Sequence, residues 1–221
     1  MPSSFDPTLQ CFDTREEWLS MRAKRIGGSD AAAVIGKNPY MTNERLWEIK
    51  TGRREQADIS DVEAVMYGAN AEEYLRELFR LDFPEYEVEY IPNNMFTNPT
   101  MPWAHASLDG WLRKGSQRGI LEIKTAFINS RMQSELWKDQ IPDYYYCQVL
   151  HYLLVTGWDF VILKAQLKYQ MGDELPFMQT RHYLIERKDV AADMLYLREA
   201  EKDFWWNIIE DVRPATILPD I

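Results

Sequence analysis

The sequence is poor in cysteine, in long hydrophobic runs and, relative to its acids, in basic residues. Its two cysteines, Cys11 and Cys147, are too few for a disulfide framework or a four-cysteine iron–sulfur cluster. No stretch approaches the roughly 18 uninterrupted apolar residues that a membrane span needs. Residues 1–6 lack the basic start and apolar run of a signal peptide. We therefore expect a cytoplasmic chain with no membrane partner, in which any metal is bound by carboxylates.

Acidic residues outnumber basic ones by 35 to 25, and the net charge is −10. This balance argues against broad adhesion to nucleic acid, which basic proteins achieve by releasing counterions. A local basic lining would still permit a nucleic-acid substrate. The first quarter is the most basic part and is interpreted as the side facing such a substrate, the alternative being a solvated helix surface. Its basic residues are Arg22, Lys24, Arg25, Lys37, Arg45, Lys50, Arg53 and Arg54.

With 46% hydrophobic and 13% aromatic residues, the chain can bury one substantial core, so residues 1–221 are predicted to form one domain. Thr14 and Glu17 fit a capping box at the start of the first helix. Helices are expected at 15–24, about 30–35, about 43–51, 62–82, 128–138, 143–156 and 188–210, and strands at about 86–91, 94–97, 103–108, 119–125, 160–167 and 182–186. This order predicts an α/β fold with a central mixed β-sheet flanked by helices.

Three charged residues stand next to apolar stretches in the middle of the chain. Asp109 ends one stretch, and Glu122 and Lys124 alternate with Leu121 and Ile123 on the next. Residues two apart on a strand point to the same face, so Glu122 and Lys124 project together while their neighbours enter the core. If the two stretches pair as a hairpin, Asp109 comes beside Glu122. Two carboxylates that close repel each other unless a divalent cation such as Mg²⁺ or Mn²⁺ lies between them.

The alternative is an exposed charge pair, because Glu-x-Lys is common on strands. The apolar flanks favour a site, since half-buried acids need a partner or a metal. A lysine beside that metal can hold or help to deprotonate an attacking water. The arrangement is typical of a metal-dependent phosphodiesterase.

Residues 15–165 resemble the PD-(D/E)xK nuclease superfamily, and within it the lambda-exonuclease or YqaJ type of viral recombinase. The resemblance rests on four blocks in the family's order, at residues 18–22 with 26–32, 67–73, 107–110 with 121–124, and 146–149. It implies a restriction-endonuclease-like core around the central sheet. The proline of the superfamily's name is absent, because Ser107 and Leu108 precede Asp109. The segment between Asp109 and Glu122 is slightly longer than in the lambda-type enzyme.

The resemblance implies roles at the site. Asp109, Glu122 and the backbone carbonyl of Ile123 would bind Mg²⁺, as two ions per site, with Mn²⁺ able to substitute. Lys124 would act on the attacking water. The helical acid of the family matches Glu72, with Glu73 a one-residue alternative, and the family's glutamine matches Gln148.

The first block carries the family's anchors for a terminal 5′-phosphate, which match Arg22 and Ser29. An arginine fork binds phosphate through two parallel hydrogen bonds, and Ser29 follows two glycines at a helix start, where free N–H groups favour an anion. An ordinary helix cap is the alternative for Ser29. Arg25 could add to this pocket, and Trp18 either stacks near the terminal nucleotide or packs. His105 and His151 are interpreted as packing or surface residues.

The function that the resemblance implies is a Mg²⁺-dependent 5′-to-3′ exonuclease. It would degrade one strand of linear double-stranded DNA to mononucleotides and leave a 3′ overhang for a single-strand annealing protein in phage-type recombination. The family forms a homotrimer ring around DNA, and a phage- or mobile-element-encoded protein in the cytoplasm of a bacterial host is expected. The alternatives are a structure-specific or restriction endonuclease of the superfamily, a catalytically silent DNA-end-binding scaffold, and an acidic interaction domain without metal.

Overall fold

A five-stranded mixed sheet forms the centre of the computed structural model, which describes residues 6–170 and 177–218. The strand order is β2-β5-β6-β7-β8, and β6 and β7 are parallel while the other neighbours are antiparallel. The strands are β2 (Glu87–Glu89), β5 (Gly110–Lys114), β6 (Gln117–Ile128), β7 (Phe160–Tyr169) and β8 (Phe177–Glu186). This mixed sheet with flanking helices confirms the predicted α/β architecture.

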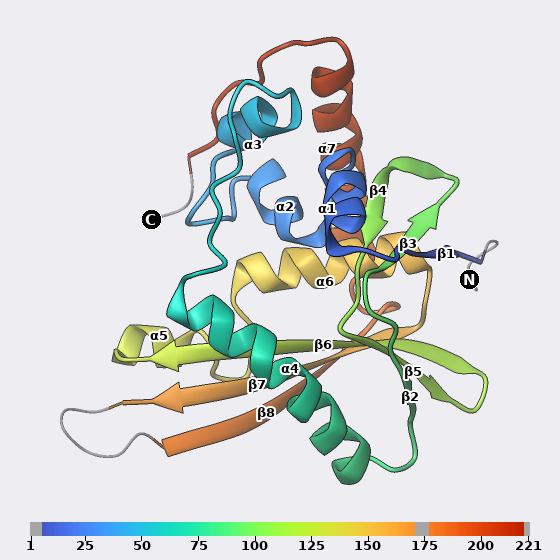
Figure 1. Ribbon diagram of the computed structural model, residues 1–221, viewed down its shortest axis with the longest axis vertical. Helices are drawn as coiled ribbons and strands as arrows, with labels where there is room; N and C mark the ends of the chain where they lie inside the picture. Colours follow the sequence, from blue (N-terminus) through green and yellow to red (C-terminus); the bar gives the residue numbers. More distant parts are fainter. Residues whose placement is uncertain (1–5, 171–176, 219–221) are drawn as a thin grey trace.

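Helices cover the two faces of the sheet unequally (Figure 1). The helix α4 (Glu63–Asp82) crosses one face, and α6 (Asp143–Thr156) lies over the other, with further helices stacked on α6. These are α1 (Arg15–Ala23), α2 (Gly28–Val34), α3 (Asn43–Lys50) and α7 (Ala191–Ile209), while α5 (Arg131–Glu135) follows β6. A small sheet of order β1-β3-β4 lies beside them, formed by β1 (Thr8–Cys11), β3 (Asn94–Asn98) and β4 (Met101–Ala106). Within the described residues, no helix is both long and apolar enough to cross a membrane.

The two faces of β6 belong to two separate apolar clusters. Leu121 and Ile123 pack with Leu75 and Phe79 of α4, whereas Ile120 packs in the larger cluster that includes α6. Because side chains alternate along a strand, Glu122 and Lys124 share the α6 face with Ile120. The prediction that Leu121 and Ile123 enter the core while Glu122 and Lys124 project together is confirmed.

The predicted pairing of residues 103–108 with 119–125 is wrong. The partner of β6 is β5, which pairs from Gly110 opposite Leu121 to Lys114 opposite Gln117. The connecting turn has two residues, of which Gly115 has a φ of 61°, a conformation that glycine adopts without steric cost. Residues 103–106 belong instead to β4 of the small sheet. Asp109 therefore precedes the strand that pairs with β6, and the segment after it is the hairpin arm rather than a loop.

Several helix details also differ from expectation. The N-cap of α2 is Gly27, not Ser29 or Asp30, and the Asp30 side chain accepts a hydrogen bond from the Gly27 N–H at 2.9 Å. On α4, Leu75 and Phe79 are buried, whereas Val65, Ala69 and Leu78 are exposed. The first helix is confirmed with its cap, in which Thr14 Oγ1 accepts from the Glu17 N–H at 3.2 Å.

Candidate active site

Asp109 is held beside Glu122 by the end of the β5–β6 ladder. The last residue pair is Gly110 opposite Leu121, so Asp109 lies one position beyond it, next to Glu122. Its carboxylate accepts a hydrogen bond from the Ile123 N–H at 2.8 Å. In an antiparallel ladder the N–H and C=O of one residue point to the same neighbouring strand. The Ile123 carbonyl therefore points to the same open edge as Asp109, past the end of β5.

The Glu122 carboxylate is 1% exposed and is bound on one oxygen only. Its Oε1 accepts from Lys124 Nζ at 2.5 Å and from Gln148 Nε2 at 2.8 Å. Its Oε2 is buried and has no hydrogen-bond partner among the described residues. Burial and the nearby Asp109 outweigh the attraction of Lys124, and together they raise the pKa of Glu122 to about 8.

Lys124 is held in the site as a cation. Burial disfavours its ammonium, but the carboxylates of Glu122 and Asp109 outweigh this effect and raise the pKa of Lys124 above its usual range. The ammonium also lies 5.0 Å from the centre of the Tyr145 ring, a cation–π contact. As an ammonium, Lys124 can donate hydrogen bonds and offset negative charge.

Glu72 joins the site from the opposite face of the sheet. Burial and the charge on Asp109 raise the pKa of Glu72 to about 7. Arg76 connects the two acids, since its Nη1 donates to Glu72 Oε1 at 3.0 Å and to the Asp109 backbone carbonyl at 2.6 Å. Glu73, the alternative one residue on, is exposed. Of the two glutamates, Glu72 is therefore the one placed next to Asp109.

The donor set fits a divalent cation, although no group of three or more His, Cys, Asp or Glu side chains within residues 6–170 and 177–218 is arranged as a metal cluster. Glu72, Asp109 and Glu122 each have a raised pKa, as expected for buried acids without enough positive charge. Glu122 Oε2 is unpartnered, and the Ile123 carbonyl faces the open edge. Carboxylate and carbonyl oxygens are the ligands that Mg²⁺ and Mn²⁺ prefer. Asp109, Glu122 and the Ile123 carbonyl are the groups that would hold the ion.

Helix α6 supplies the remaining side chains around Glu122. Gln148 Nε2 is shared between Glu122 and the Tyr152 hydroxyl, each at 2.8 Å. Tyr145 contacts Lys124 from the first turn of the same helix. The sequence analysis singled out Gln148 but missed both tyrosines. The spacing of Tyr145, Gln148 and Tyr152 at i, i+3 and i+7 was the available signal, because these positions share one helix face.

The predicted phosphate anchors are only partly brought together. Arg22 lies toward the site: burial raises the pKa of Asp109, and the charge of Arg22 is among those that act against this rise. Its guanidinium also stacks 4.1 Å from the Trp18 ring centre. The Trp18 indole N–H donates to the Asn94 carbonyl at 2.9 Å, so the edge of this ring is held against β3 while Arg22 covers a face of it. Ser29 is exposed in the first turn of α2.

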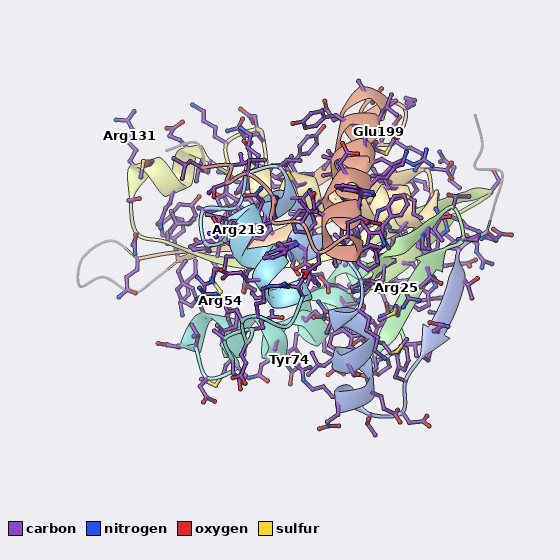
Figure 2. All side chains as sticks on the ribbon, turned by 90° about the horizontal axis from the view of Figure 1, so that it is seen from above. Arg25, Arg54, Tyr74, Arg131, Glu199 and Arg213 are labelled. Atoms are coloured by element: carbon purple, nitrogen blue, oxygen red, sulfur yellow. The ribbon has the colours of Figure 1, made fainter. Side chains whose placement is uncertain are left out.

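Arg25 is turned toward β4. Its Nε donates to the Pro102 carbonyl at 3.3 Å, and its Nη1 is buried. Other basic residues of the first quarter are engaged by acids: Lys37 with Asp143, Lys50 with Asp30, Arg53 with Asp211 and Arg54 with Glu48. Figure 2 shows Arg25 and Arg54 on well separated parts of the molecule. The first quarter therefore offers a less concentrated positive surface than its composition suggests.

His105 and His151 are both buried, so the packing interpretation is correct and a surface position is excluded. His151 Nδ1 lies 2.7 Å from Glu201 Oε1 of α7, and its Nε2 lies 2.8 Å from the His105 carbonyl. A carbonyl only accepts, so Nε2 carries a hydrogen. Sequence analysis did not identify Glu201, which is 0% exposed, because nothing along the chain marks it as the partner of a residue fifty positions earlier.

The chain is similar to known proteins over most of its length. The YqaJ-like viral recombinase domain matches residues 17–159. The uncharacterized protein YqaJ of Bacillus subtilis (strain 168) is 32% identical over 193 residues, which is 87% of this chain. The chain spans about 56% of the length of that relative.

Solved structures show the same fold. An alkaline exonuclease from Laribacter hongkongensis superposes with a TM-score of 0.67 at 21% identity, covering 89% of this chain and 94% of that one. Its complex with dAMP gives a TM-score of 0.65 at 20% identity over the same shares. A phage related exonuclease from Haemophilus somnus 129PT gives 0.53 at 11% identity, covering 85% of this chain and 96% of that one. The expected restriction-endonuclease-like core is confirmed.

Proposed function

Because the chain belongs to the YqaJ-like viral recombinase domain family, we propose that it is a Mg²⁺-dependent exonuclease acting on linear double-stranded DNA. It degrades one strand from the 5′ end to mononucleotides and leaves a 3′ single-stranded overhang. The observation that carries the proposal is the buried arrangement of Glu122, Lys124 and Gln148 beside Asp109, in which Glu122 Oε1 accepts from Lys124 at 2.5 Å and from Gln148 at 2.8 Å. An exposed charge pair would not be buried or bound in this way.

The metal-binding groups and Lys124 have separate proposed roles in the reaction. When bound by Asp109, Glu122 and the Ile123 carbonyl, Mg²⁺, or Mn²⁺ in its place, supplies Lewis acidity toward the phosphate and the attacking water, and two ions are proposed. Lys124, held as an ammonium, orients the water and offsets the negative charge that grows on the phosphoryl oxygens in the transition state. Burial strengthens both effects, because the local dielectric constant is low.

Gln148 and Glu72 complete the proposed site from the helices on either face. The Gln148 amide fixes the Glu122 carboxylate through Oε1, which leaves Oε2 free to bind a ligand. Glu72 adds a carboxylate from the α4 side and lies close enough to Asp109 for the two charges to raise its pKa. Its role is to accept a hydrogen bond from, or to bind, the water that attacks the phosphate.

The 5′ polarity follows from a proposed anchor for the terminal phosphate. Arg22 supplies the guanidinium fork and Ser29 supplies a hydroxyl and N–H groups at the start of α2. Trp18 holds the Arg22 guanidinium by stacking at 4.1 Å, and Arg25 ties the segment after α1 to β4 through the Pro102 carbonyl. An end held there brings the first phosphodiester toward Glu122 and Lys124.

The assembly and partners of the family extend the proposal. A homotrimer ring that encloses DNA would keep the enzyme on its substrate without strong electrostatic attraction. This reconciles the net charge of −10 with a DNA substrate. The 3′ overhang would pass to a single-strand annealing protein in phage-type recombination inside a bacterial cell. Since the chain spans about 56% of its curated relative, the remaining part of such a relative could add functions of its own.

The test uses linear duplex DNA with a 5′-phosphate or a 5′-hydroxyl, incubated with Mg²⁺ or with chelator, next to a closed circular control. The proposal expects Mg²⁺-dependent loss of the phosphorylated strand, slower loss of the hydroxyl-ended strand and an intact circle. Cutting of the circle would show an endonuclease. Binding of DNA ends without cutting in Mg²⁺ or Mn²⁺ would show a silent scaffold.

A further inference from the structure

A series of aromatic contacts leads from Lys124 to the protein surface. The Lys124 ammonium lies 5.0 Å from the Tyr145 ring centre. The rings of Tyr145 and Tyr144 are 4.2 Å apart, and those of Tyr144 and Tyr40 are 6.2 Å apart with an interplanar angle of 78°. Tyr144 and Tyr145 begin α6, whereas Tyr40 lies between α2 and α3. The series therefore connects the centre of the site to a second segment of the chain.

Tyr40 contributes little to packing. Its exposed fraction is 77%, and its ring meets Tyr144 at nearly a right angle, so most of the ring surface stays in contact with solvent. Its backbone is held by a hydrogen bond from its N–H to Asn38 Oδ1 at 2.8 Å, and its ring contacts Tyr144. An aromatic ring that has one neighbouring ring and is otherwise open is suited to stack against a planar ligand.

The segment that carries Tyr40 is connected through α2 to the proposed phosphate anchor. It directly follows α2, whose first turn contains Ser29, and α2 packs along α6, with Gly28 next to Gln148 and Tyr152. Lys37 and Asp143 form an ion pair at 3.4 Å that joins this segment to the start of α6. Tyr40 and Tyr144 therefore lie on the side of Lys124 at which α6 begins, linked to it by the ring contacts of Tyr145.

We propose that Tyr40, supported by Tyr144, forms a stacking subsite for a nucleobase of the DNA strand bound next to Lys124. The subsite accepts any of the four bases, because each has a π-face. It adds affinity without a basic surface, which suits a chain with a net charge of −10. This inference rests on the proposed nuclease function and adds a contact to its substrate site.

The experiment measures binding of 5′-phosphorylated duplexes in chelator and their single-turnover degradation in Mg²⁺. One duplex is intact, and each of the others carries a single abasic nucleotide at one position near the 5′ end. For the wild type, one position is expected to bind about tenfold more weakly when the base is missing, within the range that base–aromatic stacking gives. Tyr40→Ala is expected to bind intact DNA about tenfold more weakly than the wild type does. When the base at that position is missing, Tyr40→Ala should lose no further affinity. Tyr40→Phe should keep wild-type binding.

Tyr196→Ala is the matched control, because Tyr196 is also exposed, at 65%, but lies on α7. It is expected to leave binding and degradation unchanged. The subsite is overturned if Tyr40→Ala binds intact DNA as the wild type does, or if its loss is the same on intact and abasic DNA at every position. Failure of the nuclease proposal looks different, since the wild type itself would then degrade no DNA.

Discussion

The carboxylate of Asp109 accepts a hydrogen bond from the Ile123 N–H at 2.8 Å, although Asp109 lies one residue before β5 begins. The side chain takes the place that a further strand residue would occupy in the ladder. This bond fixes Asp109 against the strand that carries Glu122 and Lys124. The position of the first proposed metal ligand is therefore set by the β5–β6 ladder, whose last pair, at the end away from the hairpin turn, is Gly110 opposite Leu121.

Lys124 should be indispensable to the chemistry. Lys124→Ala is expected to lower the single-turnover rate by about 10²–10³-fold, the loss seen when one group that stabilises transition-state charge is removed. Lys124→Arg should not restore the rate, because the planar guanidinium cannot replace a compact ammonium 2.5 Å from Glu122. DNA-end binding in chelator should persist in both variants. An active Lys124→Arg enzyme would show that only the positive charge matters.

Substitution of the adjacent residues Glu72 and Glu73 should have different effects on activity. Glu72→Gln is expected to reduce activity or apparent Mg²⁺ affinity by about 10–100-fold, as removal of a group that supports a metal site does. Glu73→Gln should behave as the wild type, because Glu73 is exposed. Mg²⁺ titrations of the degradation rate measure both. Equal losses in the two variants would contradict the assignment of Glu72 to the site.

Arg22 should determine the preference for a 5′-phosphate. Arg22→Ala is expected to lower the ratio of degradation rates on phosphate and hydroxyl ends by about tenfold or more, since a charge-assisted hydrogen bond contributes about 1.5–3 kcal/mol. Ser29→Ala should give a smaller loss in the same ratio. Arg15→Ala is the control, because Arg15 also lies near the Trp18 ring, at 5.7 Å. A preserved ratio in Arg22→Ala would place the phosphate elsewhere.

The position of Gln148 should depend on the absence of a side chain at Gly28. A Cβ there would lie 2.4 Å from Tyr152 Cε1 and 2.9 Å from Gln148 Cγ. Gly28→Ala should therefore destabilise the fold by about 1–3 kcal/mol through overpacking and also slow catalysis by displacing Gln148. Denaturant midpoints and single-turnover rates measure the two effects. Full stability and full activity would show that α2 and α6 can separate without affecting the site.

The local parts of this fold were predictable from sequence. Thr14 and Glu17 identified the start of α1, and the apolar residues on either side of Glu122 and Lys124 identified a buried strand. These signals depend on neighbours within a few positions. The four blocks of resemblance then identified Glu72 and Gln148, which no local pattern connects to residues 109–124.

Long-range pairing was less predictable. The apolar segment 103–106 and the short segment 110–114 could each pair with β6, and only the packing of the small sheet decides between them. Val65, Ala69 and Leu78 fit a helical pattern but are exposed. Tyr40 and Tyr144 meet from different elements, so no spacing along the chain could have brought them together.

The metal-free protein should become less stable as pH rises from about 5 to 8, and Glu122 should account for part of this loss. The pKa of Glu122 is raised from 4.5 to about 8, and that of Glu72 from 4.5 to about 7. Between these values the folded protein holds protons that the unfolded chain has released, so the free energy of unfolding falls as pH rises.

Glu122→Gln isolates this contribution, because all other groups that titrate in this range, His105 and His151 among them, are present in both proteins. In chelator, the wild type should lose more unfolding free energy than Glu122→Gln does as pH rises from 5 to 8. The variant should therefore become more stable relative to the wild type over this range. Mg²⁺ should stabilise the wild type more at pH 8 than at pH 5, because only the ionised carboxylates bind it, and should stabilise Glu122→Gln much less. Urea unfolding at both pH values, with and without Mg²⁺, measures these differences, and Glu73→Gln is the control that should follow the wild type. A difference that is independent of pH, with equal Mg²⁺ effects in both proteins, would mean that Glu122 is already ionised and satisfied by Lys124 alone.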